Sequence, residues 1–141
     1  MTVKIRIQNV LLLALLLVVA SPSFAQTAPA INASANRSWP SFWREFSAAI
    51  NKKDVAALRK MMPDDFFDGG GGLTPTEWLE FIDKNERTGS WRDLQRSVAR
   101  GTVTNRSWSS KGIPTKVTKD KGYYFEFRKG KRWYFAGVVG D

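Results

Sequence analysis

The stretch that most constrains the fold is residues 123–139, near the C-terminus. Aromatic side chains recur at every second position on either side of Lys129-Gly130-Lys131. Such alternation around a short glycine-containing loop is typical of a β-hairpin. A three-residue loop keeps both aromatic rows on one face, so we expect Phe127 to lie opposite Trp133 and Phe125 opposite Phe135. The inward row would consist of Tyr123, Phe125, Phe127, Trp133 and Phe135.

Residues 1–25 are typical of a signal peptide. Lys4 and Arg6 precede an apolar run over residues 10–20, and Ser23-Phe24-Ala25 has small residues where a signal peptidase requires them. An uncleaved membrane anchor is the alternative, but that run is far shorter than the roughly 20 residues that span a bilayer. We therefore expect cleavage near Ala25, a periplasmic or secreted protein, and no stable membrane insertion after cleavage.

The remaining chain divides into a short linker and one domain. Residues 26–37 are mostly Ala, Asn, Thr and Ser, a composition that predicts a flexible linker. Residues 38–141 have the usual size of a single small domain. The sequence contains no cysteine, although an exported protein is permitted disulfides, so the domain must be stabilised by packing.

The charge is strongly basic and unevenly distributed. The formal net charge is +9, or +7 once Lys4 and Arg6 are removed with the signal peptide. Acidic and basic residues balance between residues 38 and 100, so the excess of the domain lies in residues 101–141. It gathers at the hairpin tip, where the candidate anion-binding residues are Arg128, Lys129, Lys131 and Arg132. The alternative is that these cations only solubilise the protein and protect the sheet edges.

The first half of the domain is predicted to be helical. A helix is expected to begin near Pro40, because the side chains of Trp39, Phe42, Trp43 and Phe46 recur at intervals of three and four. So many rings on one stripe require a large flat partner, and the aromatic hairpin is the obvious one. Asp54 is placed to cap a second helix with Val55, Leu58 and Met61 or Met62 on its buried edge, ending at Pro63.

A glycine-rich segment follows the second helix. Residues 64–72 contain three aspartates and four consecutive glycines, which predicts a solvated loop. Carboxylates beside glycines also suggest calcium, but their spacing does not fit the twelve-residue calcium loop. We therefore expect no metal site.

Two further helices are expected before the strands. Thr74, Pro75 and Glu77 form a capping box, and Trp78, Phe81 and Ile82 are predicted to line the inner face of the third helix, with Leu79 beside them and Gly89 at its end. Ser90 and Asp93 suggest a fourth helix with Trp91, Leu94 and Val98 on one side. The segment from Ser97 to Asn105 is also compatible with an extended chain.

From Thr102 onward the residues favour strands. Strands are expected over residues 102–108 and 115–118, with turns at 109–112 and 120–122 leading into the hairpin. Helices followed by strands predict an α+β fold, in which N-terminal helices pack on an antiparallel sheet of three to four strands.

Three segments together resemble a known group of proteins. They are Phe-Trp-x-x-Phe-x-x-Ala-Ile-x-x-Lys-Asp at 42–54, Met-Pro-Asp-Asp-Phe at 62–66, and Phe-x-Phe-x-x-Gly-x-x-Trp-x-Phe-x-Gly-Val-x-Gly-Asp at 125–141. This pattern resembles the small exported bacterial proteins of the nuclear-transport-factor-2-like, or SnoaL-like, group. The resemblance implies a cystatin-like cone, in which a bent sheet wraps round the helices and leaves a pocket between them.

The composition excludes several kinds of chemistry. The chain has neither His nor Cys, and therefore lacks the usual base of nucleophilic triads, thiol chemistry and the common zinc ligands. No phosphate-binding glycine motif is present, and we expect no cofactor. Enzymes of the resembling group use Asp, His or Tyr side chains in the pocket, whereas the inward row predicted here contains no carboxylate. Catalysis could then depend only on carboxylate, lysine or tyrosine side chains, and we assign no catalytic residue.

Two binding functions follow from these patterns. The first is a non-catalytic module that binds a small apolar ligand in a pocket formed by the inward aromatic row. The second is a basic surface that docks on an anionic envelope component or a protein partner through the hairpin tip. The sequence does not favour nucleic acid as a partner. For a domain this small without disulfides, however, the inward row is better explained as a solid core, because these rings are the main supply of buried apolar area.

Overall fold

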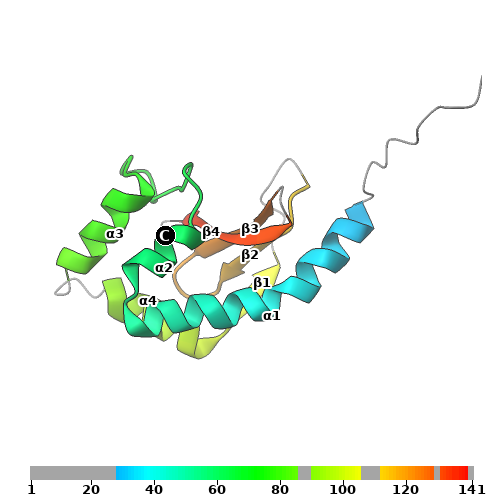
Figure 1. Ribbon diagram of the computed structural model, residues 1–141, viewed down its shortest axis with the longest axis horizontal. Coiled ribbons are helices and arrows are strands. Elements are labelled where there is room, and N and C mark those ends of the chain that lie inside the picture. The colour runs from blue at the N-terminus through cyan, green and yellow to red at the C-terminus, as the bar shows by residue number, and fades with distance from the viewer. Residues whose placement is uncertain (1–27, 86–89, 106–111, 129–130, 140–141) are drawn as a thin grey trace, which may run out of the picture.

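The computed structural model describes residues 28–85, 90–105, 112–128 and 131–139, so the predicted signal peptide lies outside the described residues. Within them, the predicted α+β fold is confirmed, because helices pack against an open antiparallel sheet whose strand order β1-β2-β3-β4 follows the chain (Figure 1). The elements are α1 (Ala28–Lys52), α2 (Val55–Met61), α3 (Pro75–Lys84), α4 (Ser90–Arg100), β1 (Val103–Asn105), β2 (Thr115–Thr118), β3 (Tyr123–Arg128) and β4 (Arg132–Val138).

Helix α1 is longer than the sequence suggested. It begins at Ala28 and passes through Pro40, so residues 28–37, which were expected to form a linker, are helical. An internal proline costs a helix about 3 kcal/mol. Tertiary contacts offset this cost, because Ala35 is only 1% exposed and its carbonyl oxygen accepts a buried hydrogen bond of 2.9 Å from Trp133 Nε1. Composition could not reveal that contact.

The β3–β4 hairpin has the predicted register. Phe127 pairs with Trp133 and Phe125 with Phe135. Beyond this point Tyr124 pairs with Gly137, which leaves Ala136 as an extra residue and produces a β-bulge. The sequence did not predict this irregularity.

The inward aromatic row forms the centre of the core. Phe125 is fully buried, and its ring makes edge-to-face contacts with four rings of α1 at centroid distances of 5.1–5.9 Å. These four rings belong to Trp39, Phe42, Trp43 and Phe46. Phe135 extends the cluster to Phe66 and Trp78. The expectation that α1 covers the hairpin is therefore confirmed.

The predicted helix caps are present. Asp54 accepts a hydrogen bond of 2.9 Å from Ala57 N at the start of α2, and Thr74 and Glu77 form the reciprocal capping box of α3. One inward assignment is wrong, because Phe81 is 48% exposed whereas Leu79 is buried. Trp78, Leu79 and Ile82 face the core. Phe81 lies at the edge of this apolar stripe, next to solvent. The predicted helix end at Gly89 lies outside the described residues.

The sequence was compatible with either a helix or an extended chain over residues 97–105, and the structure shows that this segment is helical as far as Arg100. Trp91, Leu94 and Val98 of α4 are buried as predicted. Ser97 Oγ donates to the Asp120 carboxylate at 2.9 Å and so ties α4 to the turn before β3. The chain then becomes extended in β1, while the rest of the expected strand and most of the following turn, residues 106–111, lie outside the described part.

The glycine-rich loop is attached to the sheet rather than merely solvated. Phe67 forms an isolated parallel bridge with Gly137, in which Phe67 N donates to Ala136 O at 3.0 Å and Val138 N donates to Phe67 O at 2.8 Å. The loop therefore protects the outer edge of β4 from pairing with other chains. Arg128 of β3 forms an ion pair with Asp65 of the same loop.

The carboxylate of Asp68 organises this loop. It accepts hydrogen bonds from Gly70 N, Gly72 N and Leu73 N at 2.8–3.1 Å. The bond from Leu73 N, followed by those from Gly72 N and Gly70 N, lowers the pKa of Asp68 below its ordinary value. Among the described residues, no three acidic side chains are grouped so that they could hold a metal ion. The aspartate beside the glycines thus serves the loop backbone.

Stability should therefore fall in acid partly through Asp68. Because its pKa is lowered on folding, the contribution is complete above the ordinary value of 3.8 and is lost as the pH falls below it. We expect the urea midpoint to drop between about pH 7 and about pH 2.5, and to drop less in Asp68→Asn than in the wild type. Glu80→Gln, on an exposed face of α3, is the control and should show the wild-type drop. An equal drop in wild type and Asp68→Asn would contradict the prediction.

Candidate functional site

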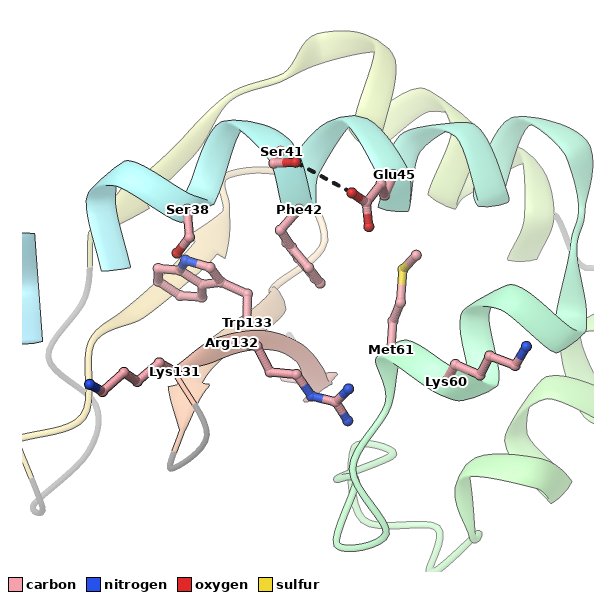
Figure 2. Close-up of a pocket in the computed structure, with 9 residues that line it drawn as sticks. All are labelled: Ser38, Ser41, Phe42, Glu45, Lys60, Met61, Lys131, Arg132 and Trp133. Carbon is pink, nitrogen blue, oxygen red and sulfur yellow. Dashed lines mark hydrogen bonds between the residues drawn. The ribbon is translucent and has the colours of Figure 1, made fainter. Parts of the chain in front are cut away.

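A partly open hollow of about 240 Å³ lies where α1, α2 and the start of β4 meet (Figure 2). Its lining residues come from α1, α2 and the hairpin; they are Ser38, Ser41, Phe42, Glu45, Lys60, Met61, Lys131, Arg132 and Trp133. The hollow thus lies between the helices and the sheet.

The apolar side of the hollow is formed by Phe42, Met61 and Trp133. Phe42 belongs to the inward stripe of α1, and Met61 is the last residue of α2. The Trp133 indole is held by the hydrogen bond to Ala35 O and by a ring contact with Trp39 at a centroid distance of 4.8 Å. Because Trp133 is held from two directions, this side of the hollow is preformed.

The polar side of the hollow is mostly basic. Lys60, Lys131 and Arg132 contribute three positive charges, and Glu45 contributes one negative charge. None of the three cations has a carboxylate partner within the described part of the chain. Glu45 accepts a hydrogen bond of 3.3 Å from Ser41 Oγ on the preceding turn of α1. Among the residues that the structure describes, the local excess of positive charge is therefore not neutralised.

The five residues predicted to bind an apolar ligand are all buried. Tyr123, Phe125, Phe127 and Phe135 pack within the core cluster, and Trp133 is the member of the row that borders the hollow. The row therefore forms part of the core, and it contributes Trp133 to the lining of the hollow. Phe42 and Met61, which complete the apolar side, were not proposed as ligand contacts from the sequence. Their juxtaposition with Trp133 depends on tertiary packing alone.

The predicted anion-binding residues have different surroundings. Arg128 is neutralised by Glu126, at 2.7 Å from its Nε, and by Asp65. Lys131 and Arg132 border the hollow, whereas Lys129 lies outside the described residues. The guanidinium of Arg132 lies 4.4 Å from the centroid of the Tyr134 ring, a cation–π contact that leaves its N–H groups available. Arg128 and Arg132 are directly opposite in the hairpin, but of the two only Arg128 has carboxylate partners among the described residues.

Sequence reasoning also missed Lys116 of β2, which faces the core side of the sheet. Its ammonium group lies 5.2 Å from the Trp39 ring centroid and 2.6 Å from Asn105 Oδ1. Partial burial lowers the pKa of Lys116. The period-two pattern of residues 115–118 was too short to reveal that a lysine points inward.

Comparison with known proteins finds no match. Neither a protein-family model, nor a curated protein, nor a solved structure is similar to this chain at a significant level. No helix among residues 28–139, apart from the gaps named above, is both long and apolar enough to cross a membrane. The function must therefore be argued from the hollow itself.

Proposed function

We propose that the protein is an exported, non-catalytic binding domain whose ligand is a small, largely apolar molecule held between α1, α2 and β4. The signal-peptide pattern of residues 1–25 supports export. The order of helices followed by an antiparallel sheet, with a hollow between them, supports membership of the nuclear-transport-factor-2-like group. Fold alone does not assign a function, so the proposal depends on the chemistry of the hollow.

The observation that carries the proposal is the preformed apolar side of an accessible hollow. Phe42, Met61 and Trp133 offer two rings and a thioether to a ligand. Ligand sites are typically concave and mostly apolar, with a few polar groups that fix orientation. If each non-hydrogen atom occupies about 30 Å³, as a water molecule does in the liquid, the hollow has room for roughly eight atoms. This size corresponds to a small metabolite or the end of a longer chain.

Catalysis receives less support from the same residues. Glu45 is the carboxylate that lines the hollow, and both Glu45 and Ser41 are exposed. Ser41 Oγ also accepts a hydrogen bond from Arg44, so the serine is bonded to a charged group on either side. A general base must be held in a fixed orientation within hydrogen-bond reach of its substrate, and solvated side chains at a rim are not held in this way.

A second candidate function is docking of the hairpin tip on an anionic envelope component. It is favoured by Lys131 and Arg132, which have no carboxylate partner in the described residues. Arg128 argues against a broad basic surface, because its charge is satisfied by two carboxylates. We therefore place the small-ligand function first.

The proposal predicts saturable binding of a small amphiphile close to Met61. The protein, produced from its full-length sequence and labelled with [¹³C]methyl-methionine, is titrated with n-octanol and with octanoate. At least one of these probes should shift the Met61 methyl signal in a saturable way. Met61→Leu, by removing one signal, assigns it.

A bulky side chain should block the same site. Ser41→Trp places a large ring at the hollow without altering a core residue, and we expect affinity to fall at least about tenfold, equivalent to about 1.4 kcal/mol. Ala99→Trp, at an exposed position of α4, is the matched control and should bind like the wild type. Absence of saturable shifts with both probes, or equal binding by Ser41→Trp, would overturn the proposed function.

A further inference from the structure

We propose that the ligand of the hollow is a small monocarboxylate with an apolar tail, and that Arg132 binds its carboxylate. This inference depends on the proposed function and specifies its ligand class. It goes beyond an apolar pocket because it assigns the anionic group, its protein partner and the orientation of the bound molecule.

The contrast between two register partners supports the inference. Arg128 and Arg132 lie directly opposite each other on β3 and β4. Arg128 binds Glu126 and Asp65, whereas Arg132 has no carboxylate partner among the described residues and lies over the Tyr134 ring. Like charges opposite each other destabilise a hairpin unless they are solvated or bridged by an anion. A ligand carboxylate would give Arg132 the kind of partner that Arg128 already has.

The direction of the side chains selects Arg132 over the two lysines. Figure 2 shows the Arg132 guanidinium extending into the open space below Phe42 and Met61, whereas the Lys60 and Lys131 side chains run outward to opposite sides. The planar guanidinium also matches a carboxylate with two parallel hydrogen bonds, which an ammonium cannot do. The lysines would contribute long-range attraction rather than direct contact.

The other residues that line the hollow indicate the length and charge of the part of the ligand beyond its carboxylate. A carboxylate at Arg132 directs the tail toward Met61 and Phe42, where apolar surface is available. The volume of about 240 Å³ corresponds to roughly eight non-hydrogen atoms, that is, two carboxylate oxygens and about six carbons. Because the hollow is partly open, the last carbons of a slightly longer chain, such as octanoate, would extend beyond it. Glu45 lies on α1, across from the hairpin, and would repel a second carboxylate. The hollow should therefore prefer monocarboxylates to dicarboxylates of the same length.

The experiment compares matched probes. Octanoate, n-octanol and octanedioate are titrated into the full-length protein with the Met61 methyl signal as the readout. We expect octanoate to bind at least about tenfold more tightly than n-octanol and than octanedioate, and this preference should shrink with added salt. Octanol binding as tightly as octanoate would overturn the carboxylate inference while leaving the proposed function intact. Binding of neither would overturn both.

The variant that tests the contact is Arg132→Gln. It should reduce the affinity for octanoate at least about tenfold and leave the affinity for n-octanol unchanged, because it removes the charge but not the apolar side. Lys119→Gln removes one charge at an exposed turn outside the hollow and should retain wild-type binding of both probes. An Arg132→Gln variant that keeps its preference for octanoate would contradict the assignment of Arg132.

A vesicle assay separates a free ligand from a lipid surface. Vesicles of phosphatidylglycerol and phosphatidylcholine are sedimented with the protein, with and without octanoate. We expect the protein to remain in solution. If it sediments in an Arg132-dependent way that octanoate does not reverse, the basic residues serve a membrane surface and the small-carboxylate inference is wrong.

Discussion

Phe125→Ala is expected to lower the free energy of unfolding by about 3–5 kcal/mol, a large part of the total for a domain of this size. The side chain is fully buried and contacts four rings of α1 as well as Phe135. The cost has two parts, the loss of apolar burial and the cavity that remains. These rings come from elements fixed by other contacts, so they cannot collapse fully into the space. Urea unfolding followed by tryptophan fluorescence measures the change.

Phe81→Ala is the matched control for this prediction. The same substitution is made at a phenylalanine that is 48% exposed on α3, so we expect a change of less than about 1 kcal/mol. Comparable losses in the two variants would mean that the hairpin does not form the centre of the core. A Phe125→Leu variant retains most of the apolar volume, and it should recover part of the stability if Phe125→Ala fails to fold.

Gly137→Ala is expected to be the second most damaging substitution, at about 3 kcal/mol. A Cβ atom at this position would lie 2.5 Å from Tyr124 Cε1 and closer still to the backbone oxygen of Phe67. The tyrosine ring could turn away, but the Phe67 carbonyl is held by its hydrogen bond from Val138 N. The methyl group would therefore separate the glycine-rich loop from the edge of β4.

Amide hydrogen exchange shows whether this separation occurs. In Gly137→Ala the Val138 amide should exchange much faster than in the wild type, because it loses its acceptor on Phe67. Gly112→Ala is the control, since a Cβ there would meet nothing within 4 Å and would suffer only the left-handed backbone, at about 1–2 kcal/mol. Unchanged protection of Val138 in Gly137→Ala would contradict the proposed role of the bridge.

The attachment of the glycine-rich loop to the sheet could not be predicted from the composition of the loop. Four consecutive glycines and three aspartates indicate a chain with no regular structure, and this part of the prediction agrees with the loop itself. Its attachment depends on residues far along the chain, since Phe67 meets Gly137 and Asp65 meets Arg128, 63 residues away. No local pattern contains that information.

In the candidate site, too, some residues could be predicted from local sequence patterns and others could not. Trp133 could be identified from the alternation of the hairpin, and Lys131 and Arg132 from the charge at its tip. Phe42 and Met61 come from two helices whose positions relative to β4 are decided by packing. Likewise, the difference between Arg128 and Arg132 arises from a carboxylate on a distant loop, so it could not be read from two arginines four residues apart.

Local sequence patterns were enough to predict the features whose causes lie within a few residues. The hairpin register, the Asp54 and Thr74 caps and the order of helices before strands all follow from side-chain period and cap chemistry, which act locally. By contrast, the extension of α1 through Pro40, the docking of the loop on β4 and the hollow beside Arg132 arise from tertiary packing. Each depends on contacts between distant residues, such as Trp133 and Ala35, 98 positions apart, whose burial and hydrogen bonding outweigh local preference.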